Sequence, residues 1–266
     1  MAELIESQMG NLICQREENR VVLDCYGVHY QELNARVRDL AKLGYKTIEL
    51  KNVNGQRYIG TGIASKDLKI RVFGTAGNDL SAFMDGPMVE VFGNAQDAVS
   101  NTMNSGKVII YGDAGDVIGY GMRGGKLFIK GRAGYRVGIH MKAYGNQVPV
   151  VVVGGTVRDF LGEYMAGGIL VVLGLEKEPG EKLVGNWVGT GMHGGIIYVR
   201  EEPERHQLGK EVGITDKIEP KEMETLGAIV QEYCADFSVN FEELITSSFF
   251  KLFPVSTRPY KKLYVY

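Results

Sequence analysis

The chain is poor in the residues that build disulfide-rich, metal-binding or membrane proteins. Its 266 residues include three cysteines, seven prolines, four histidines and one tryptophan. The cysteines, Cys14, Cys25 and Cys234, lie far apart, so neither a disulfide framework nor a thiolate metal site is indicated. No apolar run approaches the roughly 20 residues that a membrane-spanning helix needs.

The chain also lacks an excess of charge of either sign. Thirty basic and 32 acidic residues give a formal net charge of −2, which supports neither a nucleic-acid nor an anionic-membrane partner. The first residues, Met1 to Leu4, lack the basic and apolar regions of a signal peptide. We therefore expect a cytoplasmic protein.

Glycine and methionine are plentiful, and both recur at regular intervals. A period of this size indicates a stacked-repeat architecture, in which each repeat is one coil, or rung. Six methionines are spaced by 19, 19, 19, 24 and 27 residues: Met84, Met103, Met122, Met141, Met165 and Met192. Seven rungs begin at glycines, with the template G-x-x-G-x-x-x-G: Gly55, Gly74, Gly93, Gly112, Gly131, Gly155 and Gly174. Because glycine reaches positive φ without steric cost, these columns predict corners.

Each rung ends in a short segment with two alternating aliphatic positions, as in Ile70 and Val72 or Leu127 and Ile129. This period of two indicates a strand with one face always buried. Nineteen residues are too few for a propeller blade, and no helix fits between successive strands. The sequence therefore predicts a mainly β fold, a right-handed parallel β-helix of seven rungs, about 34 Å long at 4.8 Å per rung.

The flanking segments predict covers for the two ends of the coil. We expect a small α/β cap over residues 1–54, the β-helix over 55–200 and a helical segment with a tail over 201–266. In the cap, residues 20–26 and 46–51 are expected to form strands and 29–43 a helix. Near the C-terminus, Pro220 suits a first helical turn and Asn240 a helix N-cap. The tail from Pro259 is aromatic and basic, so we expect it to dock.

The variable position between the two aliphatics changes character along the coil. Early rungs place Arg71 and Glu90 there, whereas late rungs place Val152, Val171 and Tyr198. An apolar outer face needs a cover, which the C-terminal helices or a partner subunit can supply. Two insertions, at residues 144–147 and 176–182, interrupt the strict rungs, and insertions in solenoids often lie on binding faces.

Several motifs invite a chemical interpretation, but each has a structural one that fits better. Gly119–Gly124 and Gly189–Gly194 match G-x-G-x-x-G, yet a strand follows each motif where a dinucleotide site requires a helix. His140 and His193 lack a ligand partner at metal spacing and a nearby nucleophile. The methionine column is expected to fill the core rather than to bind a soft metal.

Five aspartates recur near the corners of rungs two to four: Asp79, Asp85, Asp97, Asp113 and Asp116. They do not follow the calcium-binding nonapeptide pattern, and aspartate at a turn usually bonds its own backbone. We therefore expect no catalytic, cofactor-binding or metal-binding residue. The residues that we single out are structural: Gly74, Gly93, Gly112, Gly115, Gly119, Gly131, Gly134, Gly138, Gly155 and Gly162, with the six methionines.

The rungs resemble a known family. Together with Arg57–Thr61, Glu163–Gly168 and Gly191–Val199, they are similar to the C-terminal GXGXG domain of the glutamate synthase large subunit, from about Asn54 to Arg200. A weaker resemblance holds to the formylmethanofuran dehydrogenase subunit that shares this rung. The N-terminal nucleophilic cysteine, the iron–sulfur cysteines and the FMN barrel of the glutamate synthase large subunit have no counterpart in this chain.

The resemblance implies a stand-alone structural subunit without a cofactor of its own. Its expected partners are a glutaminase-like amidotransferase subunit and an FMN/Fe–S synthase subunit, which transfer the amide nitrogen of glutamine to 2-oxoglutarate. The β-helix would hold them in register near the ammonia path. Two alternatives stay open: the scaffold of a formylmethanofuran-dehydrogenase-like complex, and an independent homo-oligomeric binding module.

Overall fold

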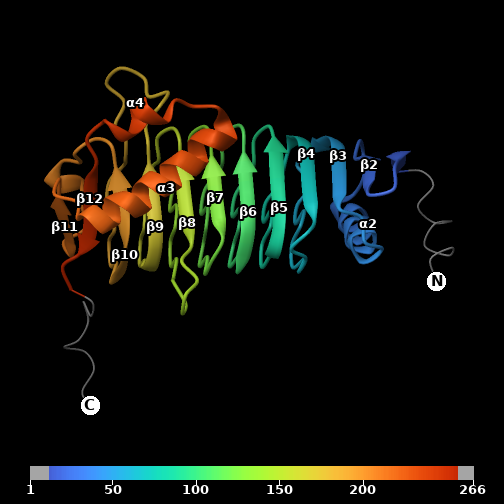
Figure 1. The fold of residues 1–266 in the computed structure, drawn as a ribbon, viewed down its shortest axis with the longest axis horizontal. Coiled ribbons are helices and arrows are strands. Elements are labelled where there is room, and N and C mark those ends of the chain that lie inside the picture. Colours follow the sequence, from blue (N-terminus) through green and yellow to red (C-terminus); the bar gives the residue numbers. More distant parts are fainter. Residues whose placement is uncertain (1–11, 257–266) are drawn as a thin grey trace, which may run out of the picture.

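A computed structural model describes residues 12–256 of the chain, in which a single twelve-stranded sheet runs the length of the molecule (Figure 1). The sheet order is β1 to β10 in sequence, then β12 and β11. The first strands are β1 (Ile13–Arg16), β2 (Arg20–Asp24), β3 (Thr47–Asn54), β4 (Lys69–Thr75), β5 (Asp85–Phe92) and β6 (Ser105–Ile110). The others are β7 (Lys126–Ile129), β8 (Val150–Val153), β9 (Ala166–Val172), β10 (Gly194–Val199), β11 (Val212–Thr215) and β12 (Phe250–Pro254).

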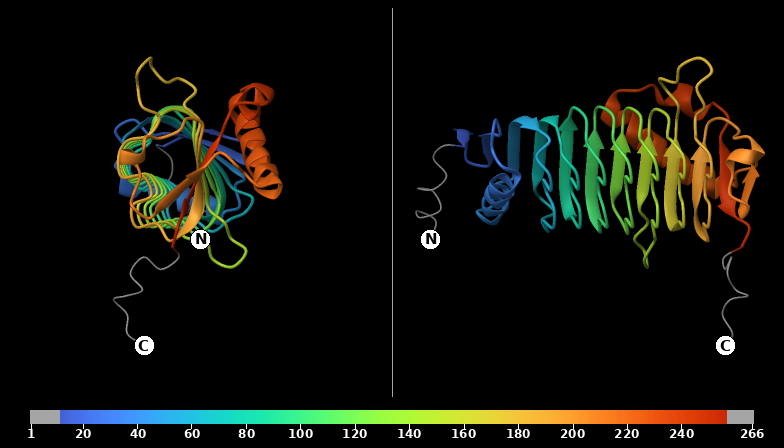
Figure 2. Two further views of the ribbon diagram at one scale, coloured as in Figure 1. Left: turned by 90° about the vertical axis from the view of Figure 1, so that its left-hand side faces the viewer. Right: turned by 180° about the vertical axis from the view of Figure 1, so that it is seen from behind.

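The strands from β2 to β10 are parallel neighbours, and each of the seven predicted rungs contributes one strand of the set β4 to β10. In Figure 1 the strands run upward on the near side while the chain advances from right to left, so the coil is right-handed. The expected parallel β-helix is therefore confirmed. Figure 2, seen from behind, shows the return half of each rung, which leads from the end of one strand to the start of the next.

The interior is dry and formed by identical inward positions of successive rungs. The paired aliphatics of strands β4 to β10 are at most 1 % exposed, and the six methionines are fully buried. One continuous core extends from Val21 in β2 to Leu252 in β12, passing through every rung. The three-part division of the chain stays a prediction, because the core and the sheet cross both expected boundaries.

The N-terminal end is closed by a helix and an antiparallel strand. Helix α2 (Tyr30–Lys42) places Leu33, Val37 and Leu40 in the core against β2 and β3. Strand β1 pairs with β2 in the antiparallel direction, which ends the parallel ladder. The buried side chain of Gln56 ties this end to the first rung by donating to the carbonyl oxygens of Cys25, at 2.8 Å, and Val28, at 3.2 Å.

The C-terminal end is closed in a similar way by strands that the sequence did not predict. Strand β12 pairs antiparallel with β10, and β11 pairs antiparallel with β12. A short 3₁₀ helix (Arg205–Gln207) carries Gln207, whose buried side chain donates to the carbonyl oxygens of Val184 and Gly185. Buried glutamines thus attach both ends to the coil. The expected docking of the tail from Pro259 falls outside the described residues.

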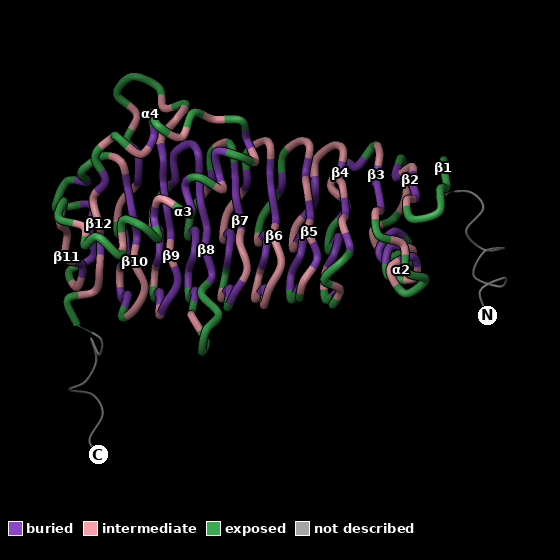
Figure 3. The backbone as a smooth tube through the Cα atoms, in the orientation of Figure 1, coloured by how far each residue is buried: buried purple, intermediate pink, exposed green. Residues whose placement is uncertain are grey.

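The C-terminal helices lie where the sequence placed them. Helix α3 (Pro220–Phe237) crosses in front of β7 to β10, with Pro220 in its first turn, and α4 (Phe241–Ile245) follows with Asn240 as N-cap (Figure 1). The apolar face of α3, including Leu226, Val230 and Tyr233, packs on the outer face of the late strands. The covered strands β7 and β8 contain runs of consecutive buried residues, drawn in purple in Figure 3. Of the two covers that the sequence leaves open, the C-terminal helices are the one that the structure shows.

The outer face of the early strands carries a ladder of ion pairs instead. Glu49 of β3 forms ion pairs with Arg20 of β2, at 3.1 Å, and with Arg71 of β4, at 3.0 Å. Arg71 also pairs with Glu90 of β5, at 3.2 Å. The hydrogen bond from Arg20, followed by that from Arg71, lowers the pKa of Glu49 against the opposing effect of burial. This half of the face is held by paired charge, without a covering helix.

Candidate functional site

The corner aspartates are occupied in holding one rung to the next. Asp97 and Asp116 accept from the backbone N–H groups of Asp116, at 2.8 Å, and Tyr135, at 2.8 Å, each one rung further on. Asp113 accepts from Arg132 at 2.7 Å in a parallel column. Aspartate was expected to bond its own backbone, and this detail was wrong. The carboxylates point along the coil because the backbone N–H groups of the next rung need an acceptor at that position.

This ladder also corrects the reason for several glycines. Gly112, Gly115, Gly131 and Gly134 do not adopt positive φ, but a Cβ atom at each would collide with the aspartate or asparagine oxygen of the preceding rung. Glycine is required there for space rather than for φ. Gly119, Gly138 and Gly162, in contrast, have φ of 70°, 72° and 67°, as the corner argument predicted. The structural roles of the remaining glycines and of the methionines stay predictions.

The two histidines lie on the surface, away from any group that would make them catalytic. His140 stacks on Tyr164, with ring centroids 5.3 Å apart, and meets the edge of Tyr120 at 5.8 Å. Nδ1 of His193 lies 3.4 Å from the carbonyl oxygen of Gly191. No group of three or more histidine, cysteine, aspartate or glutamate residues within 12–256 is placed to hold a metal ion.

Among the described residues, ionisable groups in the core or beneath α3 are held either in the protonated form or in ion pairs. Burial raises the pKa of Cys25 to about 12, which leaves the thiol protonated and unreactive. Burial also raises the pKa of Tyr198, under α3, to about 12. In Glu232 of α3, burial acts to raise the pKa, but hydrogen bonds from Lys107 and Lys126 outweigh it and the pKa is lowered. These groups anchor the helix and the core.

The most unusual surface lies on the return half of the late rungs. We call it the aromatic face and define it as Tyr120, Arg136, His140, Phe160, Tyr164 and Trp187. Phe160 stacks on Trp187 at 4.9 Å, and the guanidinium of Arg136 lies 4.7 Å from the Phe160 ring. Trp187 keeps 50 % of its surface exposed, and Tyr120 and Tyr164 keep 39 % and 37 %. This face could not be predicted from the sequence, since most of its residues adopt a positive φ, where glycine would be expected.

The backbone of this face is strained. Each return segment holds three alternating positions at positive φ. In rungs five to seven the middle position is glycine, and five of the six outer positions carry bulky residues: Arg136, His140, Phe160, Tyr164 and Trp187. A left-handed conformation costs an L-residue about 1–2 kcal/mol, whereas glycine adopts it freely. Aromatic stacking returns about 0.5–1.5 kcal/mol per pair. The two terms are of similar size, so stacking offsets the strain without a clear surplus, and strained residues often mark functional surfaces.

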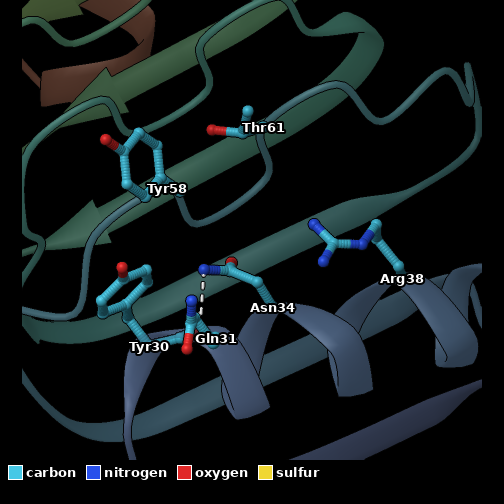
Figure 4. Close-up of a pocket in the computed structure, with 6 residues that line it drawn as sticks. All are labelled: Tyr30, Gln31, Asn34, Arg38, Tyr58 and Thr61. Carbon is cyan, nitrogen blue, oxygen red and sulfur yellow. Dashed lines mark hydrogen bonds between the residues drawn. The ribbon is translucent and has the colours of Figure 1, made fainter.

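A hollow lies where α2 meets the first rung (Figure 4). This cavity of about 420 Å³ is lined by Tyr30 and Arg38 of α2 and by Tyr58 of the rung, with a larger hollow of about 740 Å³ beside it. The two tyrosine rings lie 5.8 Å apart. Asn34 uses its side-chain donors on the carbonyl oxygens of Tyr30, at 2.8 Å, and Arg57, at 2.7 Å. The lining has no paired acid and base, so the hollow offers contacts rather than catalysis.

Comparison with known proteins agrees with this organisation. The model of the family described as GXGXG motif matches residues 44–257, which include all seven rungs. The chain belongs to the GXGXG motif family. The resemblance that the rung pattern suggested is thereby confirmed. None of the helices within 12–256 has the length and apolar content to cross a membrane.

Relatives of this GXGXG protein place it in a wider context. The uncharacterized protein MJ1350 of Methanocaldococcus jannaschii is 46 % identical over 251 residues, spanning 92 % of this chain and 96 % of that protein. A chain of the formyltransferase/hydrolase complex FhcABCD from Methylorubrum extorquens, solved with methylofuran, superimposes with a TM-score of 0.61. That match has 18 % identity and covers 89 % of this chain and 91 % of the other. At such identity the likeness concerns the fold alone.

Proposed function

We propose that this GXGXG chain is the structural β-helix subunit of a glutamate-synthase-like flavoenzyme complex. It holds a glutaminase-like subunit and an FMN/Fe–S synthase subunit in register near the path that ammonia takes between them. The reaction of the complex is transfer of the amide nitrogen of glutamine to 2-oxoglutarate with reduction. The match of the GXGXG family to residues 44–257 carries the proposal.

The side chains of the described residues support a structural rather than a catalytic role. The interior is filled by aliphatics and methionines, the corner carboxylates bind backbone amides, and the exposed histidines contact rings or carbonyls. Nucleophilic or acid–base catalysis needs a nucleophile or base oriented by a third group, and residues 12–256 hold no such arrangement. In this proposal the chemistry belongs to the partners, and we place the complex in the cytoplasm.

Purification of the tagged chain from its own organism tests the proposal. Mass spectrometry should identify a glutaminase-like and an FMN/Fe–S subunit, and the purified complex should form glutamate from glutamine and 2-oxoglutarate. The chain purified alone should bind no flavin and release no ammonia from glutamine. Ammonia release by the isolated chain would overturn the assignment, as would a native complex without an amidotransferase.

The fold likeness to a chain of the FhcABCD complex keeps a second candidate open. In that case the chain is the scaffold of a formylmethanofuran-dehydrogenase-like complex, and molybdopterin subunits should co-purify with it. Recovery of the chain alone as a stable homo-oligomer would instead favour an independent binding module. The same native purification separates these alternatives, because each predicts a different set of co-purifying proteins.

A further inference from the structure

The return halves of rungs four to six form a continuous surface with an unusual composition. Backbone hydrogen bonds place Gly121, His140 and Tyr164 in one column. The Gly121 N–H donates to the carbonyl oxygen of Ile139, the residue before His140, at 2.9 Å, and the His140 N–H donates to the carbonyl oxygen of Glu163, the residue before Tyr164, at 3.0 Å. His140 and Tyr164 are exposed and stacked, and Tyr120 meets His140 from the side. We call these three rings, with Arg123 and Lys142 beside them, the basic aromatic strip.

Like several other exposed cations of the described residues, among them Lys130 and Lys210, the cations of the strip have no acidic partner. Arg123 and Lys142 are exposed and form no ion pair among the residues that the structure describes. The nearby carboxylate, Glu163, is taken by Arg136 at 3.1 Å. On the outer sheet face, in contrast, arginines and lysines such as Arg71 and Lys107 are paired with glutamate or aspartate. The strip is therefore a local excess of positive charge on a chain whose net charge is −2.

An insertion extends the strip at its lower edge. Tyr144 and Gln147 exchange two backbone hydrogen bonds of 3.0 Å and form a tight hairpin directly after Lys142 (the loop below β8 in Figure 1). The hairpin leans on rung four, where Gln147 lies 3.3 Å from the place that a Cβ atom on Gly124 would take. It leaves the Tyr144 ring 74 % exposed. A departure from the 19-residue period thus adds one more exposed ring beside the unpaired cations.

The strained, left-handed backbone of His140 and Tyr164 is an independent reason to infer that their rings contact a partner. His140 and Tyr164 have φ of 55° and 52°, while neighbouring rungs place Gly121 and Gly191 in the same column. Glycine is therefore compatible with the coil at this position, yet two successive rungs carry large aromatic side chains there. Interface centres are enriched in aromatic residues and arginine, which matches the composition of the strip.

We propose that the basic aromatic strip is the docking surface for an acidic segment of a partner subunit. The proposal rests on the proposed function and adds where and by what chemistry the chain binds its complex. Rings of the partner or its apolar side chains pack on Tyr120, His140 and Tyr164, and its carboxylates pair with Arg123 and Lys142. Nucleic acid fits less well, because two unpaired cations neutralise few phosphates.

Charge reversal tests the electrostatic half of the proposal. The variant Arg123→Glu/Lys142→Glu is compared with Lys130→Glu/Lys210→Glu, which reverses two other exposed lysines without an ion pair among the described residues. Affinity is measured for the purified glutaminase-like and FMN/Fe–S subunits of the same organism at low and high salt. The first variant should raise the Kd for one of them about tenfold or more and weaken its salt dependence, and the control should stay within about twofold.

A ring variant separates docking from stability. Tyr164→Gly removes the ring and relieves the left-handed backbone, and Phe83→Gly makes the same change in the same column of rung two. We expect Tyr164→Gly to raise the Kd about tenfold with little change in Tm, and Phe83→Gly to leave the Kd within about twofold. A purely structural ladder would instead lower Tm in Tyr164→Gly and leave the Kd unchanged.

The outcomes distinguish failure of this inference from failure of the proposed function. A wild-type chain that assembles an active complex, together with strip variants that assemble equally well, overturns the docking surface alone. A wild-type chain that binds neither subunit overturns both. Submicromolar binding of a single-stranded oligonucleotide that the charge reversal abolishes would also overturn the proposal, since the strip would then recognise phosphate.

Discussion

The two halves of the outer sheet face stabilise their outward side chains in different ways. Over β2 to β5 the outward positions carry Arg20, Glu49, Arg71 and Glu90, which pair with one another without a covering helix. Over β6 to β10 the equivalent positions are apolar and lie beneath α3: Ile109, Phe128, Val152, Val171 and Tyr198. The inward positions do not change across this boundary, because the same buried aliphatics and methionines continue through it.

The comparison teaches that the coil and its surface are specified separately. Inward residues specify the rung, whereas outward residues depend on what covers them. Lys107 marks the boundary, since it lies on β6 and reaches Glu232, at 2.7 Å, and Asp236, at 2.5 Å, on α3. The first half is held by electrostatic pairs and the second by hydrophobic burial, so mutation and pH should affect them differently.

The largest effect should come from placing a charge beneath the helix. Val171→Asp buries a carboxylate without a partner, and we expect it to lower the free energy of unfolding by about 4 kcal/mol. Glu90→Val, at the same column in the charged half, loses partly exposed pairs and should cost about 1 kcal/mol or less. Denaturant unfolding measures both, and equal losses would show that α3 does not seal the late strands.

Truncation of the central ring of α3 should come next. Tyr233 is fully buried, meets Phe128 at 5.9 Å and donates its hydroxyl to the carbonyl oxygen of Ile129 at 3.3 Å. Tyr233→Ala should cost about 3 kcal/mol through the cavity it leaves, while Tyr233→Phe should cost about 1 kcal/mol through the lost hydrogen bond. If the two variants were equally destabilised, the hydroxyl rather than the ring would hold the helix.

In the charged half, Glu49→Gln should cost about 2 kcal/mol at neutral pH, because two arginines lose a charged acceptor. The pKa of Glu49 is lowered in the folded chain, so its contribution is complete above the ordinary value of 4.5 and disappears as pH falls through the folded value. Denaturation curves at neutral and at acid pH should show the difference between wild type and variant shrinking in acid. A difference independent of pH would contradict the ladder.

Removing a corner aspartate should have the smallest effect on the free energy of unfolding, and this effect should be the same in both halves. Asp97→Ala in rung three and Asp159→Ala in rung six each remove one acceptor from the next rung's backbone, at 2.8 Å and 2.7 Å. Each should cost about 1 kcal/mol, and the two costs should agree within about 0.5 kcal/mol. A clear inequality in thermal unfolding would mean that the cover on the outer face also influences the corners.

The repeat made the coil predictable because inward positions of one rung contact the same positions of the next. Pairs such as Ile70 and Val72 and the methionine column were therefore enough to give the fold, the phase and the strands. Glycine was less informative than expected. Gly115 is needed for the space that Asp97 occupies, a reason that appears only when two rungs are stacked.

The surfaces were not predictable, since they depend on contacts between segments that have no common period. Strand β12 pairs with β10 across about fifty residues, and no pattern around Phe250 indicates that partner. The hollow beside Tyr58 depends on how α2 packs against the first rung. The aromatic face was hidden because Phe160 and Trp187 adopt a conformation in which glycine would be expected.

Antiparallel strands at both ends give the coil a defined number of rungs. The number of rungs between two points then fixes the distance between them along the coil. At the N-terminal end the edge strand β1 runs against the coil, and at the C-terminal end the reversed strand β12 separates β10 from the edge strand β11. A partner of the kind that we propose would therefore attach along the sides of the rungs. Each side-mounted neighbour then sits at an axial position counted in steps of about 4.8 Å. Duplicating the 19 residues from Gly93 to Tyr111 should move everything bound on the later rungs one step away from everything bound near α2.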